Sequence, residues 1–173
     1  MRIGFIGLGN VGGKLAGSLR RDDWQVCVYD LSAEAMAPLV AAGATTAATP
    51  AAVTENSDLV ITCLPSPTVS AAVMEGPEGI LTALAPGKLW AEMSTTDADE
   101  VQRLAALVAA KGGAAVDCPV SGGCHRATTG NISIFAGAER PVFERVLPVL
   151  TTLGRRVLHT GPVGSASILK VVT

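Results

Sequence analysis

A glycine-rich turn near the N-terminus has the residue types and spacing that suit a dinucleotide pyrophosphate. It is a G-x-G-x-x-G directly after the apolar run 3–6, and its residues are Gly7, Leu8, Gly9, Asn10, Val11 and Gly12. In this pattern the first glycine permits a tight turn, the second lets the phosphates approach the backbone, and the third lets helix and strand pack closely. The phosphates would lie at the N-terminus of the following helix, where N–H groups and the helix dipole attract anions. A glycine-rich turn that binds no ligand is the alternative.

Asp30 ends the second apolar run, 26–29, at about the spacing from the glycine turn that is typical of a carboxylate binding the adenosine ribose. The same carboxylate would repel a 2′-phosphate, and no arginine follows it closely in the sequence. The sequence therefore favours NAD over NADP as the cofactor.

A second loop that suits an anion follows the apolar run 114–116. It contains Ser121, Gly122 and Gly123. Two glycines after a serine expose successive backbone N–H groups, which suits a carboxylate or another oxyanion. From the residues alone, a plain turn between a strand and a helix is an equally good interpretation.

Short apolar runs alternate with Ala-rich segments along the chain, and several runs are continuous, as expected for strands buried on both faces of a parallel sheet. The predicted strands are residues 3–6, 26–29, 59–64, 88–91, 114–116, 132–136 and 156–158. The predicted helices are residues 11–20, 32–42, with Ser32 as its N-cap, 97–111, 139–150 and 165–173. This succession predicts an α/β fold with a doubly wound, Rossmann-type, mostly parallel sheet of six strands, five of which are the runs up to residue 116, extended by the two strands 132–136 and 156–158.

Composition excludes several classes of protein. Of 173 residues, 49% are apolar and 16% are charged, so the chain can bury a core and is not disordered. A net charge of −2 without a basic run gives no electrostatic reason to expect nucleic acid or an anionic membrane as a partner. The uncharged stretch 35–54 is interrupted too often by proline and glycine to span a bilayer. We expect a cytoplasmic protein.

The cysteines do not suggest disulfides or a metal site. They are widely spread and include no CxxC pair: Cys27, Cys63, Cys118 and Cys124. Neither they nor His125 and His159 have the spacing of a common zinc site. Reduced thiols and no bound metal are expected.

The two ends of the sequence suggest a piece of a longer protein. The N-terminus lacks the pattern of a signal peptide. The segment 165–173 is typical of a new helix, with Ile168, Leu169, Val171 and Val172 apolar, and it ends without a capping glycine. We expect residues 1–162 to form a dinucleotide-binding domain and residues 163–173 to begin an interdomain helix, with a C-terminal helical domain absent from this chain.

Taken together and in order, five motifs resemble the cofactor-binding domain of the β-hydroxyacid dehydrogenase family. This family includes 3-hydroxyisobutyrate dehydrogenase and tartronate semialdehyde reductase and is related to 6-phosphogluconate dehydrogenase. The resemblance covers essentially the whole chain. The motifs are the glycine turn, Leu64-Pro65, Ser94-Thr95, Pro119-Val120-Ser121-Gly122-Gly123 with Gly130 behind it, and Gly161-Pro162-Val163-Gly164 leading to Lys170.

The resemblance implies a role for each matching residue. The glycine turn would bind the dinucleotide, with Leu64 and Pro65 along it and Thr95 beside the nicotinamide ribose. The substrate carboxylate would bind at Ser121, Gly122 and Gly123. Lys170 matches the family's catalytic lysine, which would act as general acid or base. The implied substrate is a small β-hydroxy acid or its semialdehyde, and the full-length protein would be a homo-oligomer.

Other activities remain open on the same scaffold, and the chain departs from the family pattern at two places. A dinucleotide-binding module without turnover and an imine reductase are the alternatives. Asn10 and Val11 replace a pair that usually ends in Met. His125 and Arg126 replace small residues. Arg126 would either add a second anion contact or extend into solvent, and the solvated orientation is the favoured interpretation.

Overall fold

The computed structural model describes all 173 residues, from Met1 to Thr173. The strands are β1 (Ile3–Ile6), β2 (Val26–Tyr29), β3 (Thr45–Thr46), β4 (Leu59–Thr62), β5 (Leu89–Glu92), β6 (Ala114–Asp117), β7 (Val120–Ser121), β8 (Ile132–Gly137) and β9 (Gly154–Gly161). The helices are α1 (Gly12–Arg21), α2 (Ala33–Ala41), α3 (Pro50–Glu55), α4 (Pro67–Glu75), α5 (Ile80–Ala83), α6 (Ala98–Ala110), α7 (Gly123–Thr128), α8 (Arg140–Leu153) and α9 (Ser165–Val172).

All nine strands belong to one sheet, in the order β3-β2-β1-β4-β5-β6-β8-β7, with β9 beside β8. The first six in this order are parallel to one another, whereas β8 runs antiparallel to β6 and β7. The predicted doubly wound sheet with six parallel strands is therefore confirmed. Two of the nine strands, β3 and β7, are two residues long and lie outside the predicted apolar runs.

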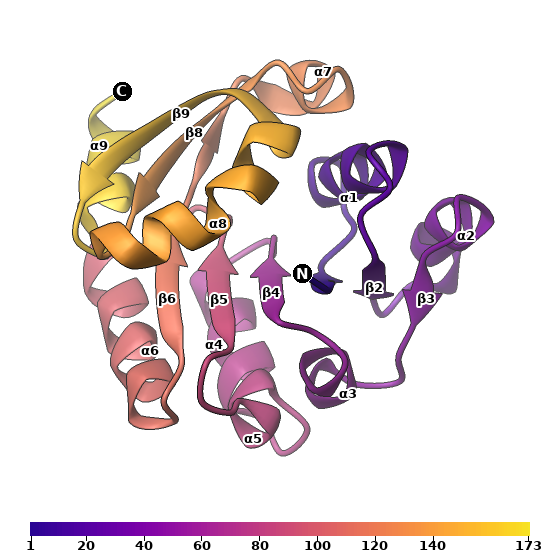
Figure 1. Ribbon diagram of the computed structural model, residues 1–173, viewed down its shortest axis with the longest axis horizontal. Helices are drawn as coiled ribbons and strands as arrows, with labels where there is room; N and C mark the ends of the chain where they lie inside the picture. The colour runs from indigo at the N-terminus through magenta and orange to yellow at the C-terminus, as the bar shows by residue number, and fades with distance from the viewer.

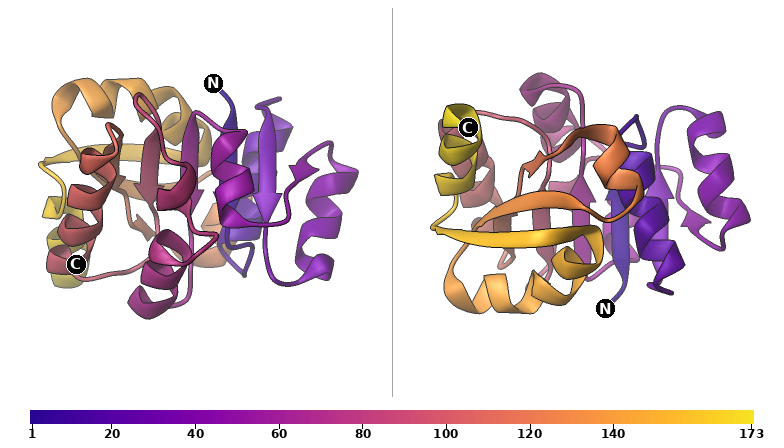
Figure 2. Two further views of the ribbon diagram at one scale, coloured as in Figure 1. Left: turned by 90° about the horizontal axis from the view of Figure 1, so that it is seen from below. Right: turned by 90° about the horizontal axis from the view of Figure 1, so that it is seen from above.

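Helices cover both faces of the parallel sheet, and alternate residues of β1, β2, β4, β5 and β6 pack into different cores. Phe5 of β1 belongs to a cluster of 27 buried residues that includes side chains of α1, α2, α7 and α8. Ile6 belongs to a second cluster of 12, on the face covered by α3, α4, α5 and α6. Figure 2 shows α8 on one side of the sheet and the α4–α5 region on the other. This burial on both faces explains the continuous apolar runs.

The parallel strands all end at one edge of the sheet, which is the upper edge of β4, β5 and β6 in Figure 1. From β1 the chain continues through β2 and β3 toward one side of the sheet, and it then returns to β4 and continues toward the other side. The strand order therefore reverses between β1 and β4. Ligands of doubly wound sheets bind at such a switch point, beyond the carboxyl ends of the strands. No helix of the structure has the length and apolar character needed to cross a membrane.

Candidate dinucleotide and substrate site

Two glycines of the glycine turn are required by the packing of the fold itself. Gly7 has a φ of +95°, which side chains rarely adopt, and a Cβ there would overlap the Cys63 carbonyl oxygen. A Cβ on Gly12 would overlap the Gly7 carbonyl oxygen, so α1 can approach β1 this closely only with glycine. The packing of the chain alone therefore accounts for glycine at Gly7 and Gly12, without any ligand.

Gly9 is different, because the fold does not need a glycine there. A Cβ on Gly9 would have no atom within 4 Å. The backbone amides of Gly9, Asn10 and Val11 donate no hydrogen bond within the chain, and no side chain caps the start of α1. Unpartnered amides at a helix N-terminus bind phosphate, and a side chain at Gly9 would occupy the space through which it approaches. The turn therefore fits a pyrophosphate.

Asp30 is tied to the glycine turn. One carboxylate oxygen, Oδ2, accepts a hydrogen bond from the Leu8 amide at 2.8 Å, and Oδ1 accepts one from the Ser32 amide at 2.8 Å. Each carboxylate oxygen has a second lone pair, so the half-buried side chain retains acceptor capacity for a ribose hydroxyl. The structure brings Asp30 to the edge of the turn, as the sequence predicts.

Hydrogen bonds also join the turns that follow β4 and β5. The Leu64 amide donates to Ser94 Oγ at 2.7 Å, and the Ser94 amide donates to Glu92 Oε1 at 2.9 Å. The neighbours of these residues, Pro65 and Thr95, are exposed at the same edge. The structure therefore fixes the predicted cofactor-lining turns relative to each other through Ser94.

Glu92 is a buried carboxyl that the sequence interpretation missed, since a charged residue at the end of a strand gives no signal of burial. It is 1% exposed, and its Oε1 also accepts a hydrogen bond from Thr62 Oγ1 at 3.1 Å. Its Oε2 has no partner, and neither has the buried hydroxyl of Ser70. Burial raises the pKa of Glu92, and the hydrogen bonds from Ser94 and Thr62 act in the opposite direction. A raised pKa favours the neutral acid.

The cysteines near these turns are not poised as nucleophiles. Burial raises the pKa of Cys63 to about 12, and burial also raises the pKa of Cys118 well above its ordinary value. A thiol reacts as the thiolate, so a raised pKa leaves it inert. All four cysteines are free, and no three His, Cys, Asp or Glu side chains lie together as a possible metal site.

The loop predicted to bind a carboxylate leads from β6 through β7 into α7. Gly122 and Gly123 have φ values of +129° and +69°, so both adopt backbone conformations that favour glycine. Both are exposed, and Ser121 is half-buried. The structure thus gives this loop an unusual, solvent-accessible backbone.

Asp117, at the end of β6, anchors the start of α9, which carries Lys170. Its Oδ1 accepts a hydrogen bond from the Gly164 amide, and its Oδ2 accepts one from the Ser167 amide, both at 2.8 Å. Burial raises the pKa of Asp117, and the hydrogen bonds from Gly164 and Ser167 lower it. Lys170 is half-buried one turn later, and its ammonium donates no hydrogen bond and forms no ion pair. The sequence interpretation assigned Asp117 no role.

Three hydrogen-bonded groups therefore lie at the carboxyl ends of the parallel strands, and the loop with Ser121, Gly122 and Gly123 belongs to none of them. The first joins the glycine turn to Asp30, the second joins the Leu64 and Ser94 turns, and the third joins β6 to the helix that carries Lys170. The groups lie on neighbouring strands of one sheet, since the Cys63 amide donates to the Ile6 carbonyl and the Cys118 amide donates to the Glu92 carbonyl. A ligand that contacts all three would have to extend along this edge of the sheet.

Several known proteins are similar to the chain. It is 36% identical over 172 residues to 2-(hydroxymethyl)glutarate dehydrogenase of Eubacterium barkeri, with 99% of this chain and 57% of that protein covered. A structure of Mycobacterium tuberculosis 3-hydroxyisobutyrate dehydrogenase with L-serine superposes with a TM-score of 0.93 at 27% identity, covering 99% of this chain and 59% of the other. An imine reductase of Myxococcus stipitatus in complex with NADP⁺, at 20% identity and a TM-score of 0.92, shares the fold. The chain thus spans little more than half the length of these relatives.

These similarities confirm the resemblance that the motifs indicate. A family model for the NAD binding domain of 6-phosphogluconate dehydrogenase matches residues 2–161, which is nearly the whole chain. The matched range includes the glycine turn, Asp30, both turns joined by Ser94 and the loop with Ser121. The chain therefore belongs to this family of NAD-binding domains.

Proposed function

We propose that the complete protein is an NAD-dependent oxidoreductase that converts a small β-hydroxy acid to its semialdehyde or catalyses the reverse reaction. The observation that carries this proposal is the space at Gly9 beside three unpartnered amides, with Asp30 at the edge of the same turn. The similarity to 2-(hydroxymethyl)glutarate dehydrogenase and 3-hydroxyisobutyrate dehydrogenase supports the substrate class.

The residues present fit NAD. The amides of Gly9, Asn10 and Val11 would bind the pyrophosphate, with Gly7, Leu8 and Gly12 shaping the turn. The carboxylate of Asp30 would accept hydrogen bonds from the adenosine ribose, and it disfavours a 2′-phosphate. When bound, NAD accepts the hydride that leaves the alcohol carbon.

The turns that Ser94 joins would form the wall of the cofactor site. Leu64 and Pro65 would lie along the dinucleotide, and Thr95 would lie beside the nicotinamide ribose. The hydrogen bond from the Leu64 amide to Ser94 Oγ supports this part of the proposal, because it holds the two turns in one geometry.

On the substrate side, Ser121, Gly122 and Gly123 would bind the carboxylate, and Lys170 would exchange the proton of the hydroxyl group. Backbone N–H groups in glycine conformations suit an oxyanion. An ammonium group without a partner in the chain suits a group that must gain and lose a proton with the substrate.

The proposal includes the division of the chain into residues 1–162 as the dinucleotide-binding domain and 163–173 as the start of an interdomain helix. Ile168, Val171 and Val172 of α9 are 58%, 74% and 74% exposed, as expected for side chains that a further helical domain covers. The complete protein would complete its substrate pocket with that domain and assemble as a homo-oligomer.

The test is the appearance of NADH when the complete protein is mixed with NAD and a panel of hydroxy acids. The panel contains 3-hydroxyisobutyrate, L-serine and a 2-(hydroxymethyl) dicarboxylic acid. We expect turnover of at least one member, and none by the 173-residue chain alone, although that chain binds NAD. Binding of NAD without turnover of any hydroxy acid by the complete protein would instead indicate a module that only binds the dinucleotide.

A further inference from the structure

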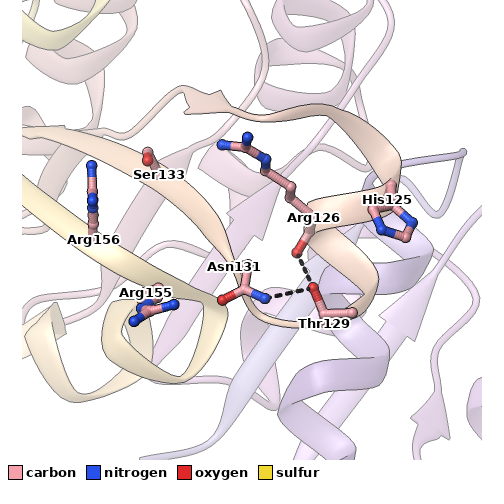
Figure 3. A pocket seen from close by; sticks show the side chains of 7 residues that line it. All are labelled: His125, Arg126, Thr129, Asn131, Ser133, Arg155 and Arg156. Carbon is pink, nitrogen blue, oxygen red and sulfur yellow. Dashed lines mark hydrogen bonds between the residues drawn. The ribbon is translucent and has the colours of Figure 1, made fainter.

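A strongly basic pocket lies between α7 and the first residues of β8 and β9, outside the three groups described above. Its volume is about 610 Å³, and it includes the side chains of Arg126, Arg155, Arg156 and Ser133. No apolar residue and no carboxylate lines it. Figure 3 shows Arg126 extending from α7 on the side of Ser133, with Arg155 and Arg156 coming from β9. We call this cavity the basic pocket.

The arginines of the basic pocket are the ones that the chain itself leaves without a partner. The other six donate hydrogen bonds to oxygen atoms of the chain: Arg2, Arg20, Arg21, Arg103, Arg140 and Arg145. Arg126, Arg155 and Arg156 donate no side-chain hydrogen bond and form no ion pair. Three unpartnered positive charges thus line one cavity of a chain whose net charge is −2.

A β-bulge brings two consecutive arginines to this cavity. Ile132 of β8 pairs with Gly154, whereas the next residue, Ser133, pairs with Arg156, so Arg155 is an extra residue in β9. Consecutive side chains of a regular strand point to opposite faces of the sheet. A bulge removes that restriction and turns a side chain toward a new direction, which is why bulges are frequent at binding sites.

The remaining face of the pocket is set by the strand register. Ser133 is paired with Ser121 on one side and with Arg156 on the other, so these three side chains share the face of the sheet opposite to Ile132 and Ile134. Both isoleucines are fully buried in the core. Ser133 therefore presents a hydroxyl, which has no hydrogen-bond partner in the chain, on the same face as Arg156 and in the lining of the pocket.

We infer that the basic pocket is a binding site for an oxyanion that carries two or more negative charges. A guanidinium group presents a planar set of N–H donors that matches the oxygens of a phosphate or carboxylate. Three such groups without a carboxylate beside them leave positive charge that a monovalent anion would not balance. The ligand is either a free phosphate or pyrophosphate, or a metabolite with two carboxylates, and both have the same oxyanion chemistry.

The test is an NMR titration of the chain in which backbone amide shifts are followed. The probes are inorganic pyrophosphate, glutarate and, as a monovalent comparison, acetate, all at constant ionic strength. We expect saturable shifts at Ser133 and Arg156 with pyrophosphate or glutarate, and at least tenfold weaker binding of acetate. Saturation by pyrophosphate alone assigns the site to phosphates, and saturation by glutarate assigns it to dicarboxylates.

Variants separate this site from general attraction of anions. The double variant Arg126→Gln/Arg156→Gln is expected to weaken binding of the divalent probes at least tenfold. If the double variant does not fold, the single variant Arg155→Gln is used in its place and is also expected to weaken binding. Arg145→Gln removes the same charge at a position where the guanidinium donates only to the Gly87 carbonyl, and it is expected to leave binding unchanged.

Two results would overturn the inference. One is the absence of saturable shifts at β8 and β9 with either divalent probe, including shifts confined to the glycine turn. The other is an equal loss of binding in Arg145→Gln and in the pocket variants. Since the readout is anion binding and not turnover, these results are independent of the proposed oxidoreductase function.

Discussion

Asp117 and Ser167 are 50 residues apart in the sequence, yet the Asp117 carboxylate accepts hydrogen bonds from both the amide and the hydroxyl of Ser167, at 2.8 and 3.0 Å. Because Asp117 ends β6 and Ser167 lies in the first turn of α9, this contact fixes the helix to the edge of the sheet. Gly137 makes room for it, since a Cβ there would overlap Asp117 Oδ1. The position of Lys170 therefore depends on a carboxylate in the core.

Replacing Asp117 by Ala is expected to loosen α9. The amides of Gly164 and Ser167 would lose their acceptor, a loss comparable to that of a helix cap and worth about 1–2 kcal/mol. Amide hydrogen exchange over residues 165–172 should accelerate, while exchange in β4 should not change. Ser167→Ala is the matched control, because it removes only the hydroxyl and should leave the exchange of α9 nearly as it is. Unchanged exchange in Asp117→Ala would show that α9 is held by packing alone.

Replacing Lys170 by Ala in the complete protein is expected to lower kcat by roughly 10²–10⁴-fold, which is the usual contribution of general acid–base catalysis. The affinity for NAD should stay nearly the same, because Lys170 lies on α9, which Asp117 anchors, and not at the glycine turn. Lys111→Ala is the control, since Lys111 is an exposed lysine at the end of α6. Turnover within about threefold of the unmodified protein would assign the proton transfer to another residue.

Glu92 should make the stability of the fold depend on pH. Burial raises its pKa in the folded state, so the folded chain holds this proton more tightly than the unfolded chain does. The contribution is fully present below the unfolded pKa, about 4.3, and is lost as the pH rises toward the folded pKa. The free energy of unfolding of the unmodified chain should therefore fall with pH relative to that of Glu92→Gln, which keeps the shape without titrating.

The measurement is urea unfolding of both proteins from about pH 4 to about pH 8. Thr62→Val is a useful companion variant, because it removes the hydroxyl that donates to Glu92 without changing a charge. The difference in free energy of unfolding between Thr62→Val and the unmodified chain should vary less with pH than the difference between Glu92→Gln and the unmodified chain. A constant difference between the free energies of unfolding of the unmodified chain and Glu92→Gln over the whole range would mean that Glu92 has the same pKa in the folded and unfolded states.

The chain is expected to bind NAD at least tenfold more tightly than NADP. If Asp30 binds the adenosine ribose as proposed, its carboxylate would lie beside a 2′-phosphate, and the two negative charges would repel each other. Calorimetric titration with both dinucleotides measures the ratio of their dissociation constants. The variant Asp30→Ser should bring this ratio closer to one. Tighter binding of NADP would contradict the assignment of Asp30 to the ribose.

Local residue types predict the parallel sheet and the glycine turn because both depend on neighbouring positions. Continuous apolar runs indicate strands that are buried on both faces. The predicted N-cap at Ser32 is confirmed, since its hydroxyl accepts a hydrogen bond from the Ala35 amide. The short strand β3 could not be predicted in this way, since it consists of two exposed threonines whose pairing depends on β2. The helices α3 and α4 were also missed, although Thr49 and Ser66 each precede a proline and cap them.

Site features that depend on distant contacts were the hardest to predict. Glu92 and Asp117 are buried because partners from other strands and from α9 surround them, and nothing in their immediate sequence shows this. The favoured sequence interpretation of Arg126 as a solvated side chain captures its exposure. It misses the two arginines that the bulge in β9 brings beside it, because a register shift leaves no sequence signal.

The glycine turn also allows its two kinds of glycine to be separated by mutation. Gly12→Ala should destabilise the fold, because its Cβ would overlap the Gly7 carbonyl oxygen. Gly9→Ala should leave the free energy of unfolding within about 0.5 kcal/mol of the unmodified chain, since its Cβ points into open space. The packing of the chain alone therefore gives no reason for glycine at Gly9.

The most direct test of the dinucleotide site is the calorimetric titration of NAD into the unmodified chain and into Gly9→Ala. We expect the unmodified chain to bind NAD at one site, and Gly9→Ala to bind it at least tenfold more weakly, a loss of about 1.4 kcal/mol, although its stability is unchanged. Equal affinity of the two proteins, or the absence of NAD binding by the unmodified chain, would contradict the account of the glycine turn as the pyrophosphate site.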